Sequence, residues 1–416
     1  MQVHKRLTTE QVSVMLKEYT NGHLLLREAL DLLGVKRSRF FLLVKRYKEN
    51  GVTFSIHYQR KSKKRLPRKT EKAIKAVLLE DKALLSDPSI PITSYKDSAT
   101  NDRLKDMGIH VATSTIIERA KLYDCYKPTW RKERVHDRQV LTSAIGALIQ
   151  HDSSHHQWSP YAKEKWYLIT SLDDYSRMFL FADLIERETS WEHIRAAKQL
   201  MSDFGIPLQY YTDQLRTFRY VSHQDSIHVF QPLPTDGVNP QWKHVVQTMG
   251  SKVIYALSPQ AKGKIERPYR WLQDRIVRTC AREKVERIQD AREVLAYEVT
   301  RYNTKQVHST TKEIPRIRFN KAKQEGKTLF RPFVLPYPYR NLNDVFCLRI
   351  TRRTNAYRKV SLHGLEIPTK VDPYQEVDIH LIPDTKNETV EVRIWWKDKM
   401  MNTVLYPRKL IPQVQF

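Results

Sequence analysis

The order of hydrophobic segments between residues 142 and 283 constrains the fold of this 416-residue chain more than any other feature. Three short strand-like runs come first, and strand-like runs then alternate with amphipathic helical segments. The expected strands are 144–151, 165–172, 177–185, 208–213 and 252–255, and the expected helices are 189–204, 240–249 and 262 to about 283. This order, β-β-β-α-β-α-β-α, predicts a mixed sheet flanked by helices.

Helical patterns precede this region. The stretch DLLGVKRSRFFLLVKRY, residues 31–47, is typical of a helix, a short turn at Gly34 and a basic helix. That is the helix-turn-helix arrangement, in which the second helix enters the major groove of DNA. A plain helical hairpin with a solvated basic face is the alternative. In a second helical unit, HVATSTIIERAKLYDCY, residues 110–126, would hold another recognition helix with Thr113 as its N-cap.

Strongly basic segments separate these units, and short strands end the chain. Seven of the ten residues from 60 to 69 are Lys or Arg, which predicts an exposed linker lying on phosphates. The expected C-terminal strands are 346–354, 359–367, 376–382, 389–396 and 401–407, which indicate a small β-barrel. The expected domains are a helix-turn-helix at 1–59, a linker at 60–69, a second helix-turn-helix at 70–126, a linker at 127–141, an α/β domain of RNase H-like plan at 142–320 and the barrel at 335–416.

The charge of the chain favours a polyanionic partner. Lys and Arg number 72 against 46 Asp and Glu, for a net charge of +26. Such an excess usually means nucleic acid, although a merely basic surface is the alternative. A hydrophobic content of 40% suffices for globular domains.

The cysteines and the N-terminus bear on the compartment. Cys125, Cys280 and Cys347 lie far apart and are odd in number, which excludes a disulfide framework and a Cys-x-x-Cys zinc module. The opening MQVHKRLTTE is not followed by an apolar core, so no signal peptide is expected. The longest apolar runs fall short of the roughly 18 residues of a membrane span. We therefore expect a protein of the reducing cell interior with no membrane partner.

Three acidic residues fall where the expected elements begin or end. Asp152 closes the first strand, Asp213 closes the fourth, and Glu266 lies near the start of the last long helix. A sheet of this order would bring them together. Two divalent metal ions about 4 Å apart, held by carboxylate oxygens, can activate an attacking oxygen and stabilise a leaving one. Mg²⁺ prefers such oxygen ligands, so the pattern predicts a two-metal site.

Other acids have different expected roles. Asp173 and Asp174 are expected to shape the turn between the second and third strands. Asp225 is the alternative candidate for the second metal-binding carboxylate, and Asp274 or Glu283 is the alternative candidate for the third.

Three histidines surround the first of these carboxylates. A zinc site would need four ligands, and His151, His155 and His156 lack a cysteine or a distant histidine pair to complete one. His155 or His156 is expected to line the mouth of the site near substrate phosphates, or to lie in a surface loop.

Four stretches together resemble a known family. HDSSHHQW, LDDYSR, YYTD and SPQAKGKIERPYRWLQDR look like the catalytic domain of DDE transposases of the retroviral-integrase (rve) superfamily, above all those of bacterial insertion sequences. The likeness covers about residues 142–315, and 258–275 is its most specific part. The tandem helix-turn-helix units and the C-terminal barrel are similar to the layout of larger members, including phage Mu transposase.

The resemblance assigns catalytic roles. In the family the first Asp ends the first strand, the second follows Thr or Ser at the end of the fourth, and the Glu follows Ser-Pro-x-x-x-Gly. Asp152, Asp213 and Glu266 match these positions and would hold two Mg²⁺ (or Mn²⁺) ions per active site. One departure is Leu215, where the family usually has a Gly that lets backbone pass close to the site. The later match, Phe218, is present.

The resemblance also implies a function. The chain would be a DNA transposase that binds the ends of an insertion sequence, cuts there and joins the end to target DNA. Its partners would be double-stranded DNA and further copies of itself bridging two ends, in the bacterial cytoplasm on the nucleoid; an accessory ATPase is neither indicated nor excluded. The expected DNA-binding residues are Lys36, Arg37, Arg39, Arg65, Arg68, Thr113, Ser114, Lys262, Lys264, Arg267, Arg270 and Arg275.

Two alternatives remain. Leu215 motivates a catalytically inactive, transposase-derived repressor or architectural protein. A structure-selective nuclease on the same fold is the other.

Overall fold

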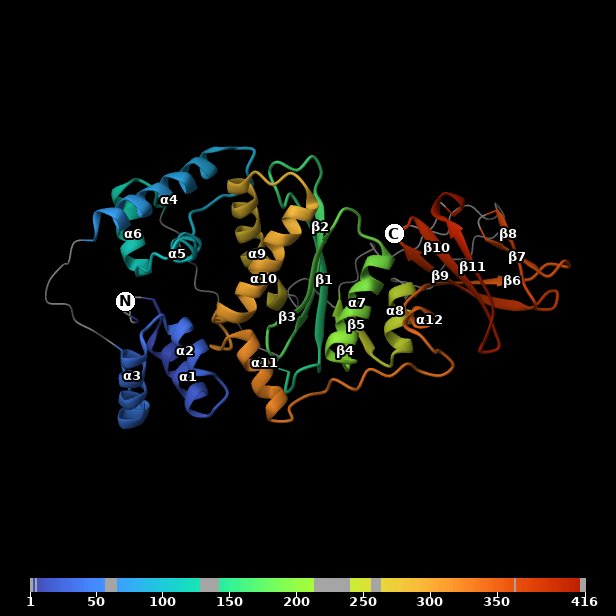
Figure 1. The fold of residues 1–416 in the computed structure, drawn as a ribbon, viewed down its shortest axis with the longest axis horizontal. Coiled ribbons are helices and arrows are strands. Elements are labelled where there is room, and N and C mark those ends of the chain that lie inside the picture. Colours follow the sequence, from blue (N-terminus) through green and yellow to red (C-terminus); the bar gives the residue numbers. More distant parts are fainter. Residues whose placement is uncertain are drawn as a thin grey trace.

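The computed structural model describes residues 3, 6–56, 66–127, 142–212, 240–255, 263–362 and 364–411, with the backbone alone at 52, 240 and 263–267. Three parts follow one another along the longest axis (Figure 1). Two groups of N-terminal helices lie at one end, a mixed α/β part occupies the centre, and C-terminal strands lie at the other end.

The central part is built on a five-stranded mixed sheet. Its strands are β1 (Ile149–His156), β2 (Trp166–Asp173), β3 (Phe179–Ile185), β4 (Gln209–Thr212) and β5 (Lys252–Tyr255). Their order in the sheet is β3-β2-β1-β4-β5. The first three pair antiparallel, and β4 and β5 run parallel to β1. The predicted element order and mixed sheet are confirmed.

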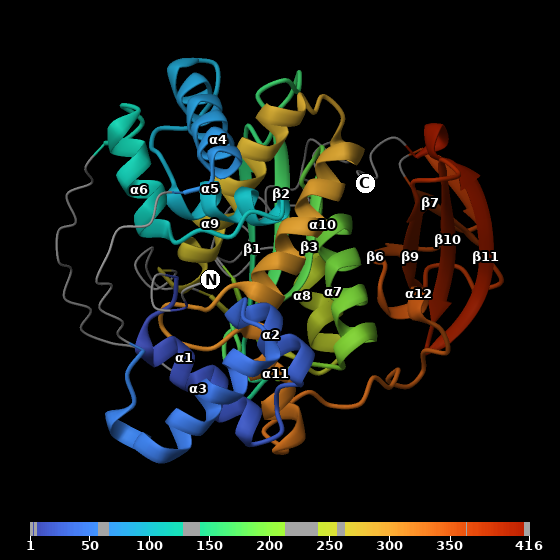
Figure 2. The same cartoon turned by 60° about the vertical axis from the view of Figure 1, so that its left-hand side comes forward.

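Helices cover both faces of this sheet (Figure 2). On one face lie α7 (Ser190–Phe204) and α8 (Pro240–Thr248), in a core that continues into the C-terminal strands. On the other lie α9 (Gly263–Glu283) and α10 (Ile288–Lys305). The next helix, α11 (Pro315–Gln324), contributes Phe319 and Ala322 to the core of α7 and α8. The apolar stripe of α7 explains its burial: Trp191, Ile194 and Leu200 all face the core.

The N-terminal helices form two groups. The first comprises α1 (Thr9–Thr20), α2 (Leu26–Leu33) and α3 (Arg37–Asn50), packed around residues such as Leu16 and Phe40. Gly34 makes the turn between α2 and α3 at φ 57°, which a residue with a Cβ rarely adopts. The second comprises α4 (Arg68–Ser86), α5 (Asp97–Asp106) and α6 (Thr113–Leu122).

Two details of the second group correct the sequence predictions. Arg68 and Lys69 belong to α4 rather than to a linker, because Pro67 precedes the helix as its N-cap. Thr113 is the first residue of α6, and the N-cap is Ala112. The Thr113 hydroxyl instead accepts a hydrogen bond from the Asn101 side chain at 3.0 Å.

The described residues of the C-terminal part form six strands in two open sheets. They are β6 (Leu348–Arg353), β7 (Lys359–Leu362), β8 (Leu365–Pro368), β9 (Glu376–Asp384), β10 (Thr389–Trp396) and β11 (Lys399–Pro407), after a short α12 (Leu342–Val345). Among the described residues, 3₁₀ turns also lie at Gly51–Thr53 and Arg408–Leu410. The sheets are β11-β10-β9-β6 and β7-β8. The predicted closed barrel is not confirmed among the described residues, and the strand predicted at 359–367 is a hairpin of two.

A connecting segment ties the central and C-terminal parts together. Thr328 and Arg331 make isolated bridges to Ile145 and Ile206, respectively. A Cβ on Gly146, which has φ 72°, would lie 2.6 Å from the Phe330 ring. Glycine is therefore required for this close approach.

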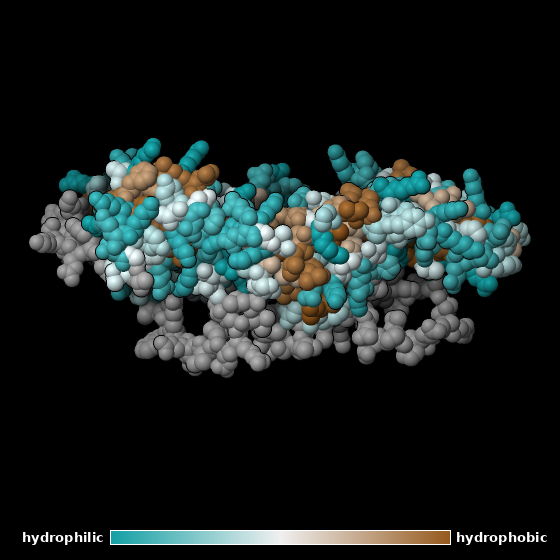
Figure 3. Space-filling view, turned by 90° about the horizontal axis from the view of Figure 1, so that it is seen from below, coloured by the Kyte–Doolittle hydropathy of each residue, from teal (hydrophilic) through white to brown (hydrophobic). Residues whose placement is uncertain are grey.

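The surface seen from below is mostly hydrophilic, with hydrophobic residues gathered in smaller patches (Figure 3). None of the described helices combines the length and the apolar composition needed to cross a membrane.

Candidate active site

Asp152 lies inside β1, not at its end. The strand continues to His156 because residues 152–156 pair with Thr170 through Trp166 of β2. Side chains alternate along a strand, so Asp152 shares the face of His156, which contacts Gln273 of α9 at 2.8 Å. The Asp152 side chain is half-buried. The predicted strand end is wrong, but a carboxylate on a paired strand is held at least as rigidly.

Tyr269 joins α9 to β1 at this position. Its hydroxyl donates to the backbone carbonyl of Asp152 at 2.8 Å and accepts from the Thr170 hydroxyl at 2.7 Å. Burial and the charge of the Asp152 carboxylate raise the pKa of Tyr269 well above its ordinary value, so the hydroxyl stays a donor. Glu266 lies one turn earlier on α9, and its side chain is outside the described structure.

The second carboxylate follows a strand that pairs with β1. In the parallel β1–β4 register, Ile149 faces Tyr210 and Gln150 faces Tyr211. The last residue of β4 is the buried Thr212. Asp213, together with Gln214, Leu215, Phe218 and Asp225, lies outside the described residues.

The opposite face of β1 carries a buried hydrogen-bonded chain. His151 contacts the Ser171 hydroxyl through Nδ1 at 2.9 Å and His193 Nδ1 through Nε2 at 2.8 Å. His193 Nε2 contacts the Glu188 carboxylate at 3.0 Å, and the Ser153 hydroxyl donates to the same carboxylate. This buried histidine chain (Ser171, His151, His193, Glu188 and Ser153) links β1 and β2 to the start of α7.

Packing and charge hold this chain in place. The His151 ring stacks on Trp242 of α8, with centroids 5.0 Å apart. Burial favours neutral Glu188, but the hydrogen bond and charge of His193, with the Ser153 hydrogen bond, outweigh it and lower the pKa of Glu188. His193 and Glu188 could not be found from the sequence, because neither lies in a motif and only the fold brings them to His151.

The remaining histidines of β1 do not form a metal cluster. His155 is exposed and stacks on Tyr167, with centroids 4.2 Å apart. Burial, followed by the charges of Lys165 and His155, lowers the pKa of His156. Both histidines lie on the strand, so the expected surface loop is wrong. Across the described residues, no group of three His, Cys, Asp or Glu side chains is placed to hold a metal ion.

Asp173 and Asp174 shape the β2–β3 turn, as predicted. Asp173 accepts from the backbone amides of Gly146 and Ser176 at 2.9 and 2.8 Å. Burial raises the pKa of Asp173 to about 6, although these hydrogen bonds oppose the shift. Asp174 pairs with Arg177 at 2.8 Å.

The two alternative acids on α9 have other surroundings. Asp274 pairs with Arg278 at 3.1 Å. Glu283 is exposed at the last residue of the helix. With a rise of about 1.5 Å per residue, Glu283 lies about 25 Å along the axis from Glu266.

The expected DNA-binding residues are placed unevenly. Exposed members begin three helices: Lys36, Arg37 and Arg39 at α3, Arg68 at α4, and Ser114 at α6. Arg270 is exposed on α9, and Thr113 is half-buried. The described residues do not include Arg65 and Lys262, and only the backbone is described at Lys264 and Arg267.

Arg275 is the exception, because it is 5% exposed. Its guanidinium pairs with Asp102 of α5 at 2.9 Å and lies over the Trp271 ring. The fully buried Arg278 likewise contacts Asp81 of α4, at 3.8 Å. These arginines hold the second helical group on α9, and in this arrangement Arg275 is not exposed; that it contacts DNA stays a prediction.

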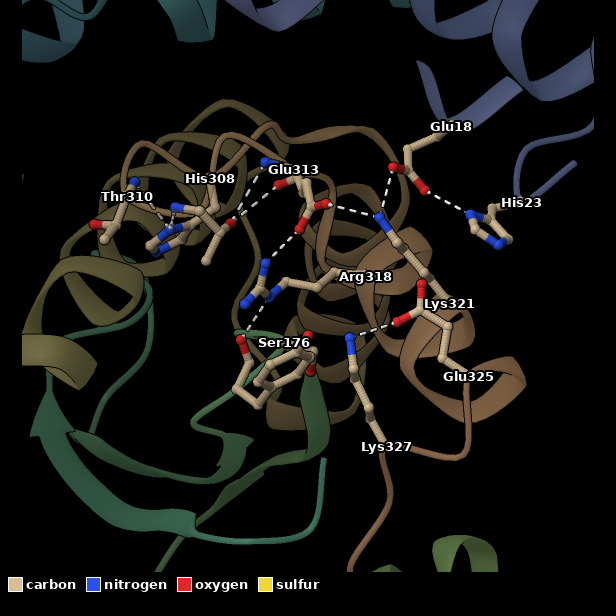
Figure 4. A network of polar contacts seen from close by, with 12 residues as sticks. Glu18, His23, Ser176, His308, Thr310, Glu313, Arg318, Lys321, Glu325 and Lys327 are labelled. Carbon is tan, nitrogen blue, oxygen red and sulfur yellow. Dashed lines mark hydrogen bonds and ion pairs between the residues drawn. The ribbon is translucent and has the colours of Figure 1, made fainter. Parts of the chain in front are cut away.

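The first helical group is attached through a more exposed network (Figure 4). Lys321 of α11 pairs with Glu18 of α1 at 2.7 Å, and Glu18 contacts His23 at 3.0 Å. Glu313 accepts from Arg318, whose Nε donates to the Tyr175 carbonyl at 2.9 Å. The network thus runs from α1 through α11 to the β2–β3 turn and leaves the basic start of α3 exposed.

Comparisons with known proteins agree with the motifs. No family model matches the chain. "Putative transposase y4bF" of Sinorhizobium fredii is 26% identical over 228 residues, which are 54% of this chain and 45% of that protein. "Transposase for insertion sequence IS1202" of Streptococcus pneumoniae is 28% identical over 171 residues, 41% of this chain and 35% of that protein. The chain spans less than half the length of these curated relatives.

Solved structures with similarity include retroviral integrases. The simian T-cell lymphotropic virus intasome in complex with PP2A regulatory subunit B56 gamma has 16% identity and a TM-score of 0.35, covering 74% of this chain and 96% of that one. The HTLV-2 integrase catalytic core domain in complex with magnesium has 18% identity and a TM-score of 0.31, covering 44% and 99%. The sequence matches confirm the resemblance that the four motifs indicate: this chain is similar to insertion-sequence transposases.

Proposed function

We propose that this chain is a DNA transposase that binds the ends of an insertion sequence, cuts the DNA there and joins the cut end to target DNA. One arrangement supports the proposal above all. Asp152 lies on a strand that pairs in parallel with β4, and Asp213 is covalently next to Thr212, the last residue of β4. Tyr269 holds α9, which carries Glu266, against Asp152 itself.

Asp152, Asp213 and Glu266 would together hold two Mg²⁺ (or Mn²⁺) ions. A set of carboxylates fits hard cations that prefer oxygen ligands, and Asp152 is half-buried on a strand paired on both sides. When bound, such ions lower the barrier to displacement at phosphorus by activating the attacking oxygen and neutralising charge on the leaving one.

The reaction needs no nucleophilic side chain. Water attacks the phosphorus at the boundary of the element, the bond to the 3′ oxygen breaks, and a free 3′-OH remains. That hydroxyl then attacks a phosphorus of target DNA in line, forms a new phosphodiester and releases a target 3′-OH. The protein positions the two DNAs and the carboxylates, which is the main contribution of enzymes to phosphoryl transfer.

Binding of the ends is assigned to the N-terminal helices. Lys36, Arg37 and Arg39 are exposed at the start of α3, where helix-turn-helix proteins contact base edges. Arg68 and Ser114 offer contacts at the starts of α4 and α6. The net charge of +26 would add affinity for phosphates in both end and target DNA. Joining two ends requires copies that bridge them, so we expect a homo-oligomer acting on bacterial DNA in the cytoplasm.

An inactive, DNA-binding derivative is the second candidate. It is favoured by Gln214 and Leu215, which follow Asp213 where the family usually has a Gly. A nuclease that cuts without joining is the third.

A single assay separates the three candidates. Labelled duplexes covering the DNA on each side of the coding sequence are incubated with the protein, an unlabelled second duplex, and Mg²⁺, Mn²⁺ or chelator. A transposase gives a metal-dependent nick at one boundary and then a joined product. Specific binding without a nick in either metal would identify the inactive derivative, and nicks without joined product would identify a nuclease.

A further inference from the structure

We infer that Tyr269 is a positioning residue, whose hydroxyl fixes α9, and with it Glu266, in register with Asp152. This inference rests on the proposed function, because it concerns the same carboxylates. Beyond the proposed function, the Tyr269 hydroxyl is assigned a role of its own: it sets the position of α9 relative to β1.

The hydroxyl is anchored in the sheet from two sides. Asp152 and Thr170 face each other across β1 and β2. The Tyr269 hydroxyl donates to the Asp152 carbonyl at 2.8 Å and accepts from the Thr170 hydroxyl at 2.7 Å. The Thr170 side chain is fully buried and Tyr269 is nearly so. Two hydrogen bonds from one oxygen to paired strands fix its position along and across the sheet.

The position of Tyr269 in the helix makes it an effective anchor for Glu266. The two residues are three apart on α9, about 4.5 Å along the helix axis. Pro268 lies between them and has no N–H to complete the helical hydrogen bond to residue 264. The first turn of α9 is therefore less constrained by its own backbone hydrogen bonds. The hydrogen bonds of Tyr269, the residue directly after Pro268, then determine where that turn lies.

Apolar packing alone would not set this register. Leu272 and Ile276 hold α9 on the sheet, but hydrophobic contact is non-directional and tolerates small sliding movements. Metal ligands must be held within roughly 0.5 Å of their productive positions. Another polar link, between Gln273 and His156, lies a turn further from Glu266, so it constrains the first turn less.

Tyr269→Phe tests the inference with the least disturbance, because the ring is kept and only the hydroxyl is lost. We expect the Mg²⁺ concentration for half-maximal cleavage to rise about 3- to 10-fold, as for the loss of a buried hydrogen bond. Mn²⁺ should restore most of the activity, since Mg²⁺ demands near-ideal octahedral geometry. Affinity for end DNA should not change.

Tyr302→Phe is the matched control. Tyr302 is a buried tyrosine on α10 that packs against Trp271 of α9, and its hydroxyl has no hydrogen-bond partner among the described residues. Its loss should leave the Mg²⁺ requirement unchanged. Thr170→Val removes the other partner of the Tyr269 hydroxyl and should shift the Mg²⁺ requirement in the same direction by a smaller factor.

A readout independent of cleavage is the rise in Tm that each protein shows with increasing Mg²⁺ or Mn²⁺ in the absence of DNA. The inference predicts that Tyr269→Phe needs several-fold more Mg²⁺ than wild type or Tyr302→Phe for the same rise. If wild type cuts and Tyr269→Phe has the wild-type Mg²⁺ dependence in both assays, the positioning role is wrong while the proposed function stands. If wild type shows neither cleavage nor a metal-dependent Tm, both the positioning role and the proposed function are wrong. Should Tyr269→Phe fold poorly, Thr170→Val decides by the same comparison.

Discussion

The two faces of β1 differ in what their polar residues do, although these residues are neighbours in sequence. His151 and Ser153 face α7 and α8, where the buried histidine chain pairs them with His193 and Glu188. Asp152 faces α9, is half-buried and is held through its backbone rather than through the histidine chain. One face therefore stabilises the strand, and the other presents a carboxylate. Mutations on the two faces should separate stability from activity.

Asp152→Asn should have the largest effect on activity. Losing a metal ligand removes several kcal/mol of transition-state stabilisation, so cleavage should fall by at least about 1,000-fold. The free energy of unfolding should change by less than about 1 kcal/mol, because the backbone contacts remain. Cleavage assays and urea denaturation measure the two quantities. Retained strand transfer would remove Asp152 from the active site.

His193→Leu should show the opposite pattern. It removes the His193 contact of the buried Glu188 carboxylate, which keeps the Ser153 hydrogen bond, and this should lower the free energy of unfolding by about 3 kcal/mol. Cleavage per folded molecule, measured well below Tm, should stay within about threefold of wild type. His155→Leu, on an exposed residue of the same strand, is the control and should cost less than about 0.5 kcal/mol. Equal losses at the two positions would deny the histidine chain a structural role.

The pH dependence of the stability of Glu188→Gln tests the role of the carboxylate charge in the buried histidine chain. Because the pKa of Glu188 is lower in the folded state than its ordinary 4.5, its charge contributes stability that is complete above pH 4.5. That contribution is lost as the pH falls through the lower folded pKa. The stability gap between wild type and Glu188→Gln, from urea midpoints between about pH 6 and 3, should thus narrow on the acid side. A gap that stays constant would show that the carboxylate charge is not what the chain stabilises.

Arg39→Ala concerns neither face and should have the smallest effect. Arg39 is exposed at the start of α3, so its loss should weaken binding of end DNA a few-fold. The slope of the logarithm of the binding constant against the logarithm of the salt concentration should become shallower by about one. Lys48→Ala, at the far end of the same helix, is the matched control. Stability and cleavage of saturated complexes should match wild type. Equal binding losses for the two variants, measured by titration at several salt concentrations, would argue against insertion of the start of α3 into the groove.

Much of the central fold could be predicted because it is encoded in local periodicity. The strand 252–255 was predicted to the residue, and α9 begins and ends within one residue of its prediction. The extension of β1 beyond Asp152 could not be predicted, because residues 152–156 are polar and become a strand only by pairing with β2.

The candidate site, like the fold, could be predicted from the sequence only in part. The motif located Asp152 and the helix of Glu266, but sequence charge alone could not show that Arg275 is neutralised by Asp102 on α5. The C-terminal strands were recognisable from their alternation, whereas closure into a barrel depends on which strands pair at the edges, and alternation carries no information on that.

The most direct test of the account compares two glutamates of α9, Glu266→Gln and Glu283→Gln, in metal-dependent cleavage of the end duplex. Glu283 is exposed at the end of the helix away from Tyr269, so it controls for the loss of a charge on α9. We predict that Glu266→Gln abolishes the nick and the joined product while end binding persists, and that Glu283→Gln retains both products. Cleavage by Glu266→Gln at the wild-type rate would contradict the three-carboxylate site.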